Sequence, residues 1–501
     1  MINKRRVFLF LLIILAAFLR LYRIEVLTEF LGDQGRTGII IWNAWTTKTL
    51  PLVGPPVLTG QFLGPFFYYF IGLPFILSGF HPLASALFMA FFGVLSVYLI
   101  FYLGEKLFGF WIGIAMASLY AVSPYIVSSD RTLWEPNIIP FFVLSYIFCI
   151  YSIYQKRKFS AFFLMGIIVG ILVQLHYPNI FFIVLSGLFW VYILATRKKQ
   201  ESTLKILLWS FWGIIGFLLV LSPFLYYESH HAWQDVKEIV LIFLVPTASG
   251  ADTKPVQQIL FDLSSRVFYK VIPASIQYLN LMGIVEFVIL GIAFLQKKFW
   301  SIFFAFWFTI GILAMSFYHG TVFDHYLQFL LPVPFFLLGG AMFFYKQKIS
   351  STTLAFIIVV ILISQLRNTD IFSKENNDIV RTSRMISEVI SMTNNEPFSF
   401  TLISSRSFSD LHYRYFFTTR RRNPVPIINT SYGNLFLVCE KTPCVSPQEL
   451  ERIGFIQALC YEDHCGGPYP TIDLRAWQFV THSDVLDGRI YMYKRKSFGG
   501  T

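Results

Sequence analysis

The sequence predicts an all-α polytopic membrane domain of about eleven transmembrane helices, followed by a small α+β domain outside the cytoplasm. Composition gives the first reason, because 55% of the 501 residues are hydrophobic and only 14% are charged, against about 25% charged residues in soluble proteins. A second reason is the succession of apolar runs from Val7 to about Gln365, and a third is the ordinary polarity that follows Arg367. We therefore place a membrane domain at 1–366 and an extracytoplasmic soluble domain at 367–501.

The same figures exclude several classes of protein. With 40 Lys and Arg and 28 Asp and Glu, a soluble fold of this size could not cover so much apolar surface. This excludes a cytosolic enzyme, a nucleic-acid-binding protein and a disordered chain. The net charge of +12 is carried mainly before Arg367, so the tail is not a basic arm for nucleic acid.

Hydrophobic runs predict where the chain crosses the membrane. A helix needs roughly 20 apolar residues for this, because it must satisfy its own backbone in the hydrocarbon core. A shorter run at 65–79 is interrupted by Gly72 and Pro74, and we interpret it as an interfacial or re-entrant helix on the outer face. The predicted spans are 7–24, 83–103, 110–127, 137–154, 160–175, 180–195, 204–226, 277–296, 300–317, 326–345 and 352–366.

Basic clusters predict the orientation, because cytoplasmic loops are enriched in Lys and Arg. With 65–79 not crossing, eleven spans place all of these clusters inside, so we predict a multi-pass plasma-membrane protein with a cytoplasmic N-terminus. The first run is read as a retained anchor rather than a cleaved signal peptide, and Arg20 and Arg23 near its outer end are expected to snorkel. The basic clusters are 4–6, Lys106, 156–158, 197–199, 297–298, and Lys346 with Lys348.

With this topology, most acidic residues before Arg367 fall on the outer side, several of them in short connectors next to lipid. A charge at that depth is costly unless it is paired or hydrated, so it usually marks a functional site. The segments that hold such residues are 25–64, 128–137, 318–326 and the minimal connector 176–178.

The tail is expected to contain a helix at 378–392 and strands at 398–403 and 427–438. It also holds two Cys-x4-Cys pairs, whose spacing matches neither a zinc knuckle nor a redox Cys-x-x-Cys motif. Outside the cytoplasm, one or two disulfides are the favoured interpretation, with a metal site as the minor alternative. These cysteines are Cys439, Cys444, Cys460 and Cys465.

The order of short motifs resembles a known family. It begins with residues 32–36 (Gly-Asp-Gln-Gly-Arg) after the first span and 64–69 (Gly-Pro-Phe-Phe-Tyr-Tyr) opening the interfacial helix. It continues with Ser123-Pro124, Arg131, 134–136 (Trp-Glu-Pro), His325-Tyr326, Pro332 and Pro334. Over roughly 1–345, this order resembles the GT-C glycosyltransferases of the dolichyl-phosphate-mannose protein mannosyltransferase and lipid A aminoarabinose transferase type. The Trp-Trp-Asp motif of the oligosaccharyltransferase branch does not occur.

The resemblance implies an integral-membrane enzyme that moves a single sugar from a polyprenyl-phosphate-linked donor to a hydroxyl of a protein, lipid or glycan acceptor. It also implies that Asp33 is the catalytic base, since an acidic residue just after the first span has this role in the family. Many members have a second carboxylate next to it, where this chain has Gln34. Glu135 lies near the family's second acidic position.

The chemistry of such a transfer explains these residue types. An acceptor hydroxyl must lose its proton as it attacks C1 of the sugar, and a positioned base contributes about 10²–10⁴-fold to that step. One base suffices for a single displacement with inversion, whereas retention requires a nucleophile. The departing lipid phosphate gains negative charge, so cationic side chains should face it.

Eleven residues are predicted to bind substrate. Arg131 ranks first as a phosphate ligand, because it lies in a short connector near Glu135. The sequence requires no cofactor and assigns no metal ligand, although a divalent ion shared by Asp33 and Glu135 stays open. The predicted substrate-binding residues are Arg131, Glu135, Lys48, Arg36, Arg266, Lys270, His176, His325, Tyr326, Tyr68 and Tyr69.

Each choice has a structural alternative. Asp33 also suits a turn or helix cap, Arg131 suits an interface where its side chain snorkels, and Glu135 suits the positive end of a helix dipole. His176, His325 and the tyrosines also suit simple packing at the membrane interface.

Two other functions compete with the transferase. A transporter or flippase of lipid-linked saccharides would carry charges at mid-membrane and usually an inverted repeat. Glu286 is the clearest charge within a span, and we find no repeat. A non-catalytic membrane subunit, whose outer domain recruits partners, is the third hypothesis.

Overall fold

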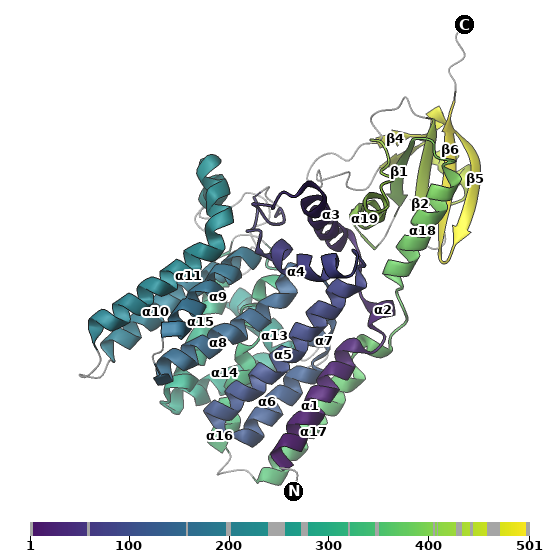
Figure 1. Cartoon of the computed structure of the whole chain (residues 1–501). Coiled ribbons are helices and arrows are strands. Elements are labelled where there is room, and N and C mark those ends of the chain that lie inside the picture. Colours follow the sequence, from purple (N-terminus) through teal and green to yellow (C-terminus); the bar gives the residue numbers. More distant parts are fainter. Residues whose placement is uncertain are drawn as a thin grey trace. The chain divides into compact units, whose positions relative to one another are not determined.

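The structure is a computed structural model (Figure 1). It describes the chain except residues 1–3, 58–60, 157–158, 197–201, 239–255, 272–278, 319–320, 346–349, 404–405, 408, 427–432, 441–443, 458–470 and 497–501. The following therefore lie outside the described residues: Cys460, Cys465, the predicted basic clusters 197–199 and Lys346 with Lys348, and residues 157–158 of the cluster 156–158.

The chain forms two compact units, and we describe each by itself. The membrane unit comprises Met1–Tyr22, Leu52–Phe70 and Ala86–Ser373. The sheet unit comprises Arg23–Pro51, Ile71–Ser85 and Lys374–Thr501. The sheet unit thus takes two short segments from the first hundred residues as well as the tail, whereas the sequence placed a single domain boundary at 366/367.

The membrane unit is built of helices, many of which run side by side as one bundle (Figure 1). Each of the eleven predicted spans contains a helix, which confirms the predicted multi-pass membrane domain, while the orientation of the termini stays a prediction. The helices are α1 (Lys4–Leu21), α5 (Leu83–Phe108), α6 (Phe110–Val122), α7 (Pro124–Ser129), α8 (Ile139–Lys156), α9 (Phe159–Leu175), α10 (Phe181–Ala195), α11 (Thr203–His230), α13 (Val256–Tyr269), α14 (Leu279–Leu295), α15 (Phe299–Ser316), α16 (Val333–Tyr345) and α17 (Ser351–Arg367).

Length separates the helices that can cross a bilayer unaided from the others. Within the described residues, six helices of 18 residues or more are apolar enough to do so, and five shorter apolar helices accompany them. One of the shorter helices is α4 (Phe66–Leu77), which has 12 residues and is therefore about 18 Å long. That is shorter than the roughly 30 Å hydrocarbon core, in agreement with the predicted interfacial or re-entrant helix.

Small residues let α9 and α11 pack closely. A Cβ at Gly166 would lie 1.8 Å from the carbonyl oxygen of Gly213, and one at Gly216 would lie 2.6 Å from the carbonyl oxygen of Phe163. The backbones of the two helices therefore touch, as is common where membrane helices associate through van der Waals packing.

Arg20 corrects one expectation from the sequence. Its side chain does not snorkel but is fully buried, and its Nε lies 2.8 Å from Oδ2 of Asp130. Its NH1 also donates to the carbonyl oxygen of Ala121 at 3.1 Å. The physical reason is that Asp130, which directly follows α7, lies beside the last turn of α1, so the guanidinium pairs with a buried carboxylate and does not extend to water.

The sheet unit holds a four-stranded sheet in the order β1-β2-β6-β5. β1 and β2 are parallel, and the other pairings are antiparallel. The helix predicted at 378–392 and the strand predicted at 398–403 are present as α18 and β1, and β2 lies at the end of the strand predicted at 427–438. The strands are β1 (Phe398–Ile403), β2 (Asn434–Cys439), β5 (Trp477–Val485) and β6 (Gly488–Arg495), with a separate antiparallel pair of β3 (Phe455–Gln457) and β4 (Thr471–Asp473).

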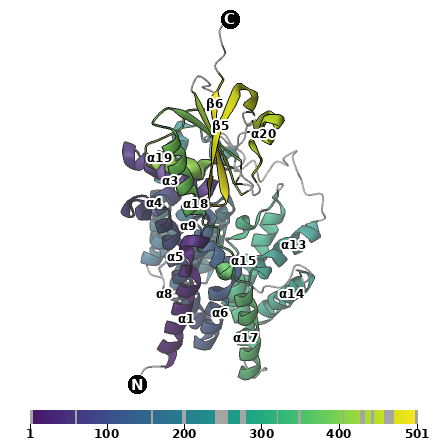
Figure 2. The ribbon, with the colours of Figure 1, turned by 90° about the vertical axis from the view of Figure 1, so that its right-hand side faces the viewer.

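Helices cover both faces of this sheet. Figure 2 shows α18 (Asp378–Met392) and α19 (Leu411–Thr419) on one side of β5 and β6, with α20 (Pro447–Ile453) on the other. Side chains alternate along a strand, so Leu435 and Leu437 face Leu450 of α20, whereas Phe400 contacts Tyr413 of α19 at 5.5 Å between ring centroids. Burial on both faces explains why β2 consists almost entirely of apolar residues.

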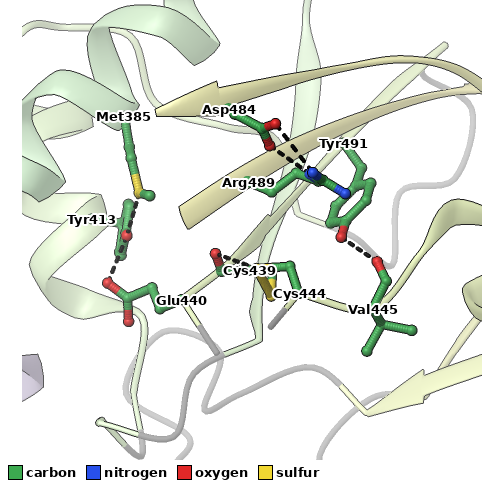
Figure 3. The surroundings of a disulfide bond; sticks show 9 residues. All are labelled: Met385, Tyr413, Cys439, Glu440, Cys444, Val445, Asp484, Arg489 and Tyr491. Carbon is green, nitrogen blue, oxygen red and sulfur yellow. Dashed lines mark hydrogen bonds and ion pairs between the residues drawn. A yellow bond between two sulfur atoms is a disulfide. The ribbon is translucent and has the colours of Figure 1, made fainter. Parts of the chain in front are cut away.

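A disulfide links the last residue of β2 to Cys444. Cys439 and Cys444 are bonded, with their Cα atoms 5.9 Å apart (Figure 3). Beside the disulfide, the hydroxyl of Tyr491 donates to the carbonyl oxygen of Val445. This pairing agrees with the disulfide predicted for the tail.

Candidate functional site

Asp33 lies in the first turn of α3 (Gly32–Thr47), in the sheet unit. Its Oδ1 accepts a hydrogen bond from Arg36, one turn further along, at 2.7 Å, and its side chain is 24% exposed. Gln34 bends back, so that its Oε1 accepts from the backbone N–H of Leu31 at 2.9 Å. Gln34 therefore takes part in capping the N-terminus of α3. Asp33 does not make this bond, and its partly exposed carboxylate has the Arg36 guanidinium beside it.

Glycines fix the position of α3. A Cβ at Gly35 would lie 2.4 Å from the backbone nitrogen of His412 in α19, and one at Gly38 would lie 2.5 Å from the ring of Tyr415. Gly32 is similarly close to Ser409, at 2.7 Å. Because these glycines recur every three residues, they lie on one face of α3, and that face packs directly on α19.

Lys48 ends the same helix. It adopts the left-handed conformation at the C-terminus of α3, and its Nζ lies 3.8 Å above the ring of Trp45. Fifteen residues separate it from Asp33, which places the two about 22 Å apart along the helix axis. The structure therefore does not bring Lys48 together with Asp33.

In the membrane unit, two predicted phosphate ligands share one carboxylate. The Nε of Arg266, in α13, donates to Oδ1 of Asp324 at 2.9 Å, and Nζ of Lys270 lies 3.5 Å from Oδ2 of the same side chain. Arg266 also lies 3.5 Å from the exposed carboxylate of Asp262. Lys270 is 6% exposed, and its Nζ lies 4.3 Å above the ring of Tyr125. We call Arg266, Lys270 and Asp324 the cation cluster.

Burial and mutual charge set the protonation of this cluster. Burial lowers the pKa of Lys270 to about 8, although Asp324 opposes the change. Burial alone would raise the pKa of Asp324, but Lys270 and Arg266 together bring it below its ordinary value. The carboxylate is thus ionised at neutral pH, while Lys270 loses its proton at a much lower pH than an exposed lysine does.

Two histidines and a tyrosine lie beside the cation cluster. His325 follows Asp324 in the short helix η4 (Asp324–Leu327), and its ring centroid lies 5.3 Å from that of His176. The ring centroid of Tyr326 lies 4.8 Å from that of His176, and the ring centroid of Trp134 lies 4.7 Å from that of His325. Burial lowers the pKa of His176 to about 3 and that of His325 to about 4. Both rings are therefore neutral at pH 7, so they can donate or accept a hydrogen bond but carry no positive charge.

Arg131 and Glu135 have well-defined buried positions. The NH2 of Arg131 donates to the carbonyl oxygen of Tyr22 at 2.9 Å, and its NH1 donates to that of Leu19 at 3.4 Å. Glu135 opens the short helix η1 (Glu135–Ile138) and is almost fully buried. Arg131 thus donates to carbonyl oxygens at the end of α1 and is buried, whereas the structural alternative was a side chain that snorkels at the interface.

The two tyrosines predicted to line a lipid groove lie in the first turn of α4. Tyr68 is almost fully buried and Tyr69 is partly exposed.

For a metal, no group of three or more potential His, Cys, Asp or Glu ligands occurs among the residues that the structure describes.

Among the predicted substrate-binding residues, contacts within the membrane unit bring together Arg266, Lys270, His176, His325 and Tyr326. In the sheet unit, they bring together Asp33 and Arg36. Sequence reasoning missed Asp324 and Tyr125 as partners of Lys270. The adjacency of Asp324 and His325 in a short outer connector was a usable signal for the first, whereas no pattern pointed to Tyr125.

Comparison with known proteins identifies the fold. Residues 63–227, about a third of the chain, match the family model of dolichyl-phosphate-mannose-protein mannosyltransferases. The crystal structure of ArnT from Cupriavidus metallidurans in the apo state is similar, with a TM-score of 0.59 and 11% identity over 98% of each chain. The structure of ArnT bound to undecaprenyl phosphate is also similar, with a TM-score of 0.57 and 11% identity over 98% of each chain.

A third solved structure, the Archaeoglobus fulgidus oligosaccharyltransferase in complex with Zn and sulfate, has a TM-score of 0.50 and 13% identity, covering 86% of this chain and 67% of that chain. A search of curated proteins finds no matching sequence. The chain therefore has the GT-C fold, which confirms the predicted fold class and the predicted resemblance.

Proposed function

We propose that this chain, with its GT-C fold and its match to a mannosyltransferase family model, is an integral-membrane glycosyltransferase. It moves a single sugar from a polyprenyl-phosphate-linked donor to an acceptor hydroxyl with inversion. The fold carries this proposal, because ArnT resembles the chain over almost its whole length and its structure is known with undecaprenyl phosphate bound. The acceptor is a hydroxyl of a protein, lipid or glycan.

Asp33 is the general base of the proposed reaction. The acceptor oxygen attacks C1 of the sugar, the bond from C1 to the phosphate oxygen breaks, and the proton of the hydroxyl passes to the Asp33 carboxylate. The partial exposure of the Asp33 side chain in the first turn of α3 supports this role, since an acceptor hydroxyl needs access to the carboxylate. Arg36, at 2.7 Å, holds the carboxylate in one orientation.

The leaving phosphate is held by Arg266 and Lys270. The guanidinium of Arg266 and the amino group of Lys270 both pair with the carboxylate of Asp324, whose side chain is about half exposed. Lys270 supports the assignment most strongly, because a buried lysine is costly in a membrane protein and usually marks a functional site. In reactions of this kind, preorganised cations that face developing negative charge often contribute more to the rate than any other group.

The other predicted ligands keep lesser roles in the proposal. His176, His325 and Tyr326 border the cation cluster and can hydrogen-bond to the donor as neutral groups. Arg131 ranks below Arg266 and Lys270, because it already donates to carbonyl oxygens of α1. Glu135, Lys48, Tyr68 and Tyr69 stay predicted contacts of the substrate or of the lipid carrier.

A transfer assay tests this function with the full chain purified in detergent. The donors are radiolabelled polyprenyl-phosphate sugars that carry either a hexose or a pentose, and the acceptors are protein, lipid and glycan fractions of the cell envelope. We expect one donor to give labelled product, and Asp33→Asn to lower kcat by about 10²–10⁴-fold. Asp473→Asn is the matched control, because Asp473 is also a carboxylate of the sheet unit with an arginine partner, at 2.9 Å.

Two outcomes would contradict the proposal. Full activity of a correctly inserted Asp33→Asn protein would remove Asp33 from the mechanism. Movement of an intact lipid-linked saccharide across reconstituted vesicles, without transfer to any acceptor, would instead support the flippase alternative.

A further inference from the structure

Helix α19 contacts every part of the sheet unit that comes from the first hundred residues. Gly32, Gly35 and Gly38 of α3 face Ser409, His412 and Tyr415, each at a distance that leaves no room for a Cβ. A Cβ added at Gly35 would lie 2.4 Å from the backbone nitrogen of His412 and 2.5 Å from its Cα. That contact does not depend on a flexible side chain, so the position of α3 on α19 is sharply defined.

Tyr415 extends the contact beyond α3. Its hydroxyl donates to the carbonyl oxygen of Phe80, in the segment between α4 and α5. Its ring centroid lies 5.3 Å from that of Phe30, just before α3, and 6.1 Å from that of Phe75, in α4. Aromatic pairs at such distances stabilise a contact beyond the burial of their area. One residue of the tail thus contacts both early segments of the sheet unit.

The start of α18 holds the chain just before Asp33. The backbone nitrogens of Asn376 and Asn377 donate to the carbonyl oxygen of Val26 at 3.1 and 3.0 Å. The backbone nitrogen of Phe30 donates to Oδ2 of Asp378 at 3.4 Å. Asp378 is itself paired with Arg381, at 2.6 Å. The tail therefore fixes the segment before Asp33 through hydrogen bonds and the helix after it through backbone packing.

We propose that α19, through His412 and Tyr415, is the positioning element of the catalytic base, so that the C-terminal tail takes part in the reaction by orienting Asp33. This inference rests on the proposed function of Asp33. Gly35 and Gly38 are the positioning residues on the other side of the contact. The motif at 32–36 thus combines a base with Gly35, one of the two glycines that position it.

Geometry predicts how large the effect of a methyl group will be. At Gly35 the added Cβ would lie about 1 Å inside ordinary carbon contact distance, and its neighbour is backbone that cannot rotate away. Helix α3 must then move outward by a similar amount. A displacement of about 1 Å at a catalytic group can lower the rate by about 10²-fold.

The test compares glycine variants of the full chain in the transfer assay. We expect Gly35→Ala and Gly38→Ala each to lower kcat by about 10²-fold with the KM for the donor unchanged, since the cation cluster is untouched. Gly187→Ala in α10 and Gly291→Ala in α14 are matched controls, because a Cβ at either position meets nothing within 4 Å. Both controls should keep full activity.

A double variant distinguishes positioning from general damage. Gly38 and the Tyr415 ring form one positioning contact, so Tyr415→Ala should lower kcat about as much as Gly38→Ala, and Gly38→Ala/Tyr415→Ala should lose no more than either single variant. The clash at Gly35 is with backbone, so His412→Ala should not rescue Gly35→Ala. If Gly35→Ala fails to fold, the Gly38 pair gives the result alone.

The Asp33→Asn background separates failure of this inference from failure of the proposed function. If α19 acts through Asp33, Gly35→Ala should cause no further loss in Asp33→Asn protein, and an equal loss in both backgrounds would overturn the inference. If Asp33→Asn is fully active while Gly35→Ala is not, the role of the base is wrong. A rise in the donor KM without a change in kcat would also contradict positioning of the base.

Discussion

The cation cluster of the membrane unit and the Asp33 end of α3 in the sheet unit are held in place by different forces. Side-chain ion pairs and a ring contact hold Lys270 and Arg266, whereas backbone contact at Gly35 holds α3. Ion pairs respond to pH and salt, and close packing does not. The charge of the cation cluster therefore depends on pH, whereas the position of the base depends on close backbone packing.

Ion pairs themselves differ between the two units. In the membrane unit, Arg20 is fully buried and pairs with Asp130 at 2.8 Å. In the sheet unit, Arg489 pairs with Asp484 across the β5–β6 hairpin (Figure 3), where more than half of the Asp484 side chain is exposed. Breaking an ion pair should therefore lower the free energy of unfolding strongly for Arg20–Asp130 and weakly for Arg489–Asp484.

The largest stability effect is expected for Arg20→Met. This change leaves Asp130 buried without its main cationic partner, which typically costs about 3–5 kcal/mol in the free energy of unfolding. Thermal unfolding in detergent, followed by near-ultraviolet circular dichroism, measures the change. The double variant Arg20→Met/Asp130→Ala removes both charges and should recover much of the loss. A double variant as unstable as the single one would show that packing, not charge, stabilises this position.

The next effect concerns Lys270 and its charge. Removing one preorganised cation from developing negative charge lowers the rate by about 10²–10³-fold, so Lys270→Gln should lower kcat/KM by that factor. Because burial lowers the pKa of Lys270 to about 8, the charged form is present below that pH and is lost above it. The kcat/KM of the wild-type protein, which reports the free enzyme, should therefore fall as the pH rises through about 8.

Lys270→Arg is the matched variant for this pH dependence. A guanidinium keeps its charge at any pH of the assay, so the alkaline limb near pH 8 should disappear while activity at neutral pH changes far less than in Lys270→Gln. A limb that persists unchanged in Lys270→Arg would assign it to another group.

Much of the fold could be predicted from the sequence, because membrane spans and sheet strands leave strong local patterns. Apolar runs placed the spans, and α18 and β1 begin and end where polarity and alternation indicated. The two-unit organisation could not be predicted in this way. Residues 23–51 join the sheet unit through contacts with residues 376–415, and no local pattern reveals a partner so far along the chain.

For the candidate site, residue types and depth could be predicted from the sequence, but the partners of each residue could not. Arg266, Lys270 and His325 were candidates because the departing phosphate calls for Arg, Lys or His side chains and the predicted topology places these three on the outer side. No pattern showed that Arg131 donates to carbonyl oxygens of α1, or that Arg20 meets Asp130, since both depend on which helices adjoin. The glycines around Asp33 were noticed as a motif, yet their packing on α19 required the fold.

The smallest predicted effect concerns the exposed ion pair of the β5–β6 hairpin. Arg489→Gln should lower the free energy of unfolding of the sheet unit by less than about 1 kcal/mol, because an exposed pair is solvated and costs side-chain entropy to form. Arg489 also lowers the pKa of Asp484, so this contribution is present at neutral pH and is lost as the pH falls through the lowered pKa.

In 1 M salt the difference between Arg489→Gln and wild type should vanish, since screening acts within about 3 Å, whereas the loss in Arg20→Met should persist because that pair is buried. If the Arg489 variant lost as much stability as the Arg20 variant, or if both losses responded equally to salt, burial would not be what separates the two pairs.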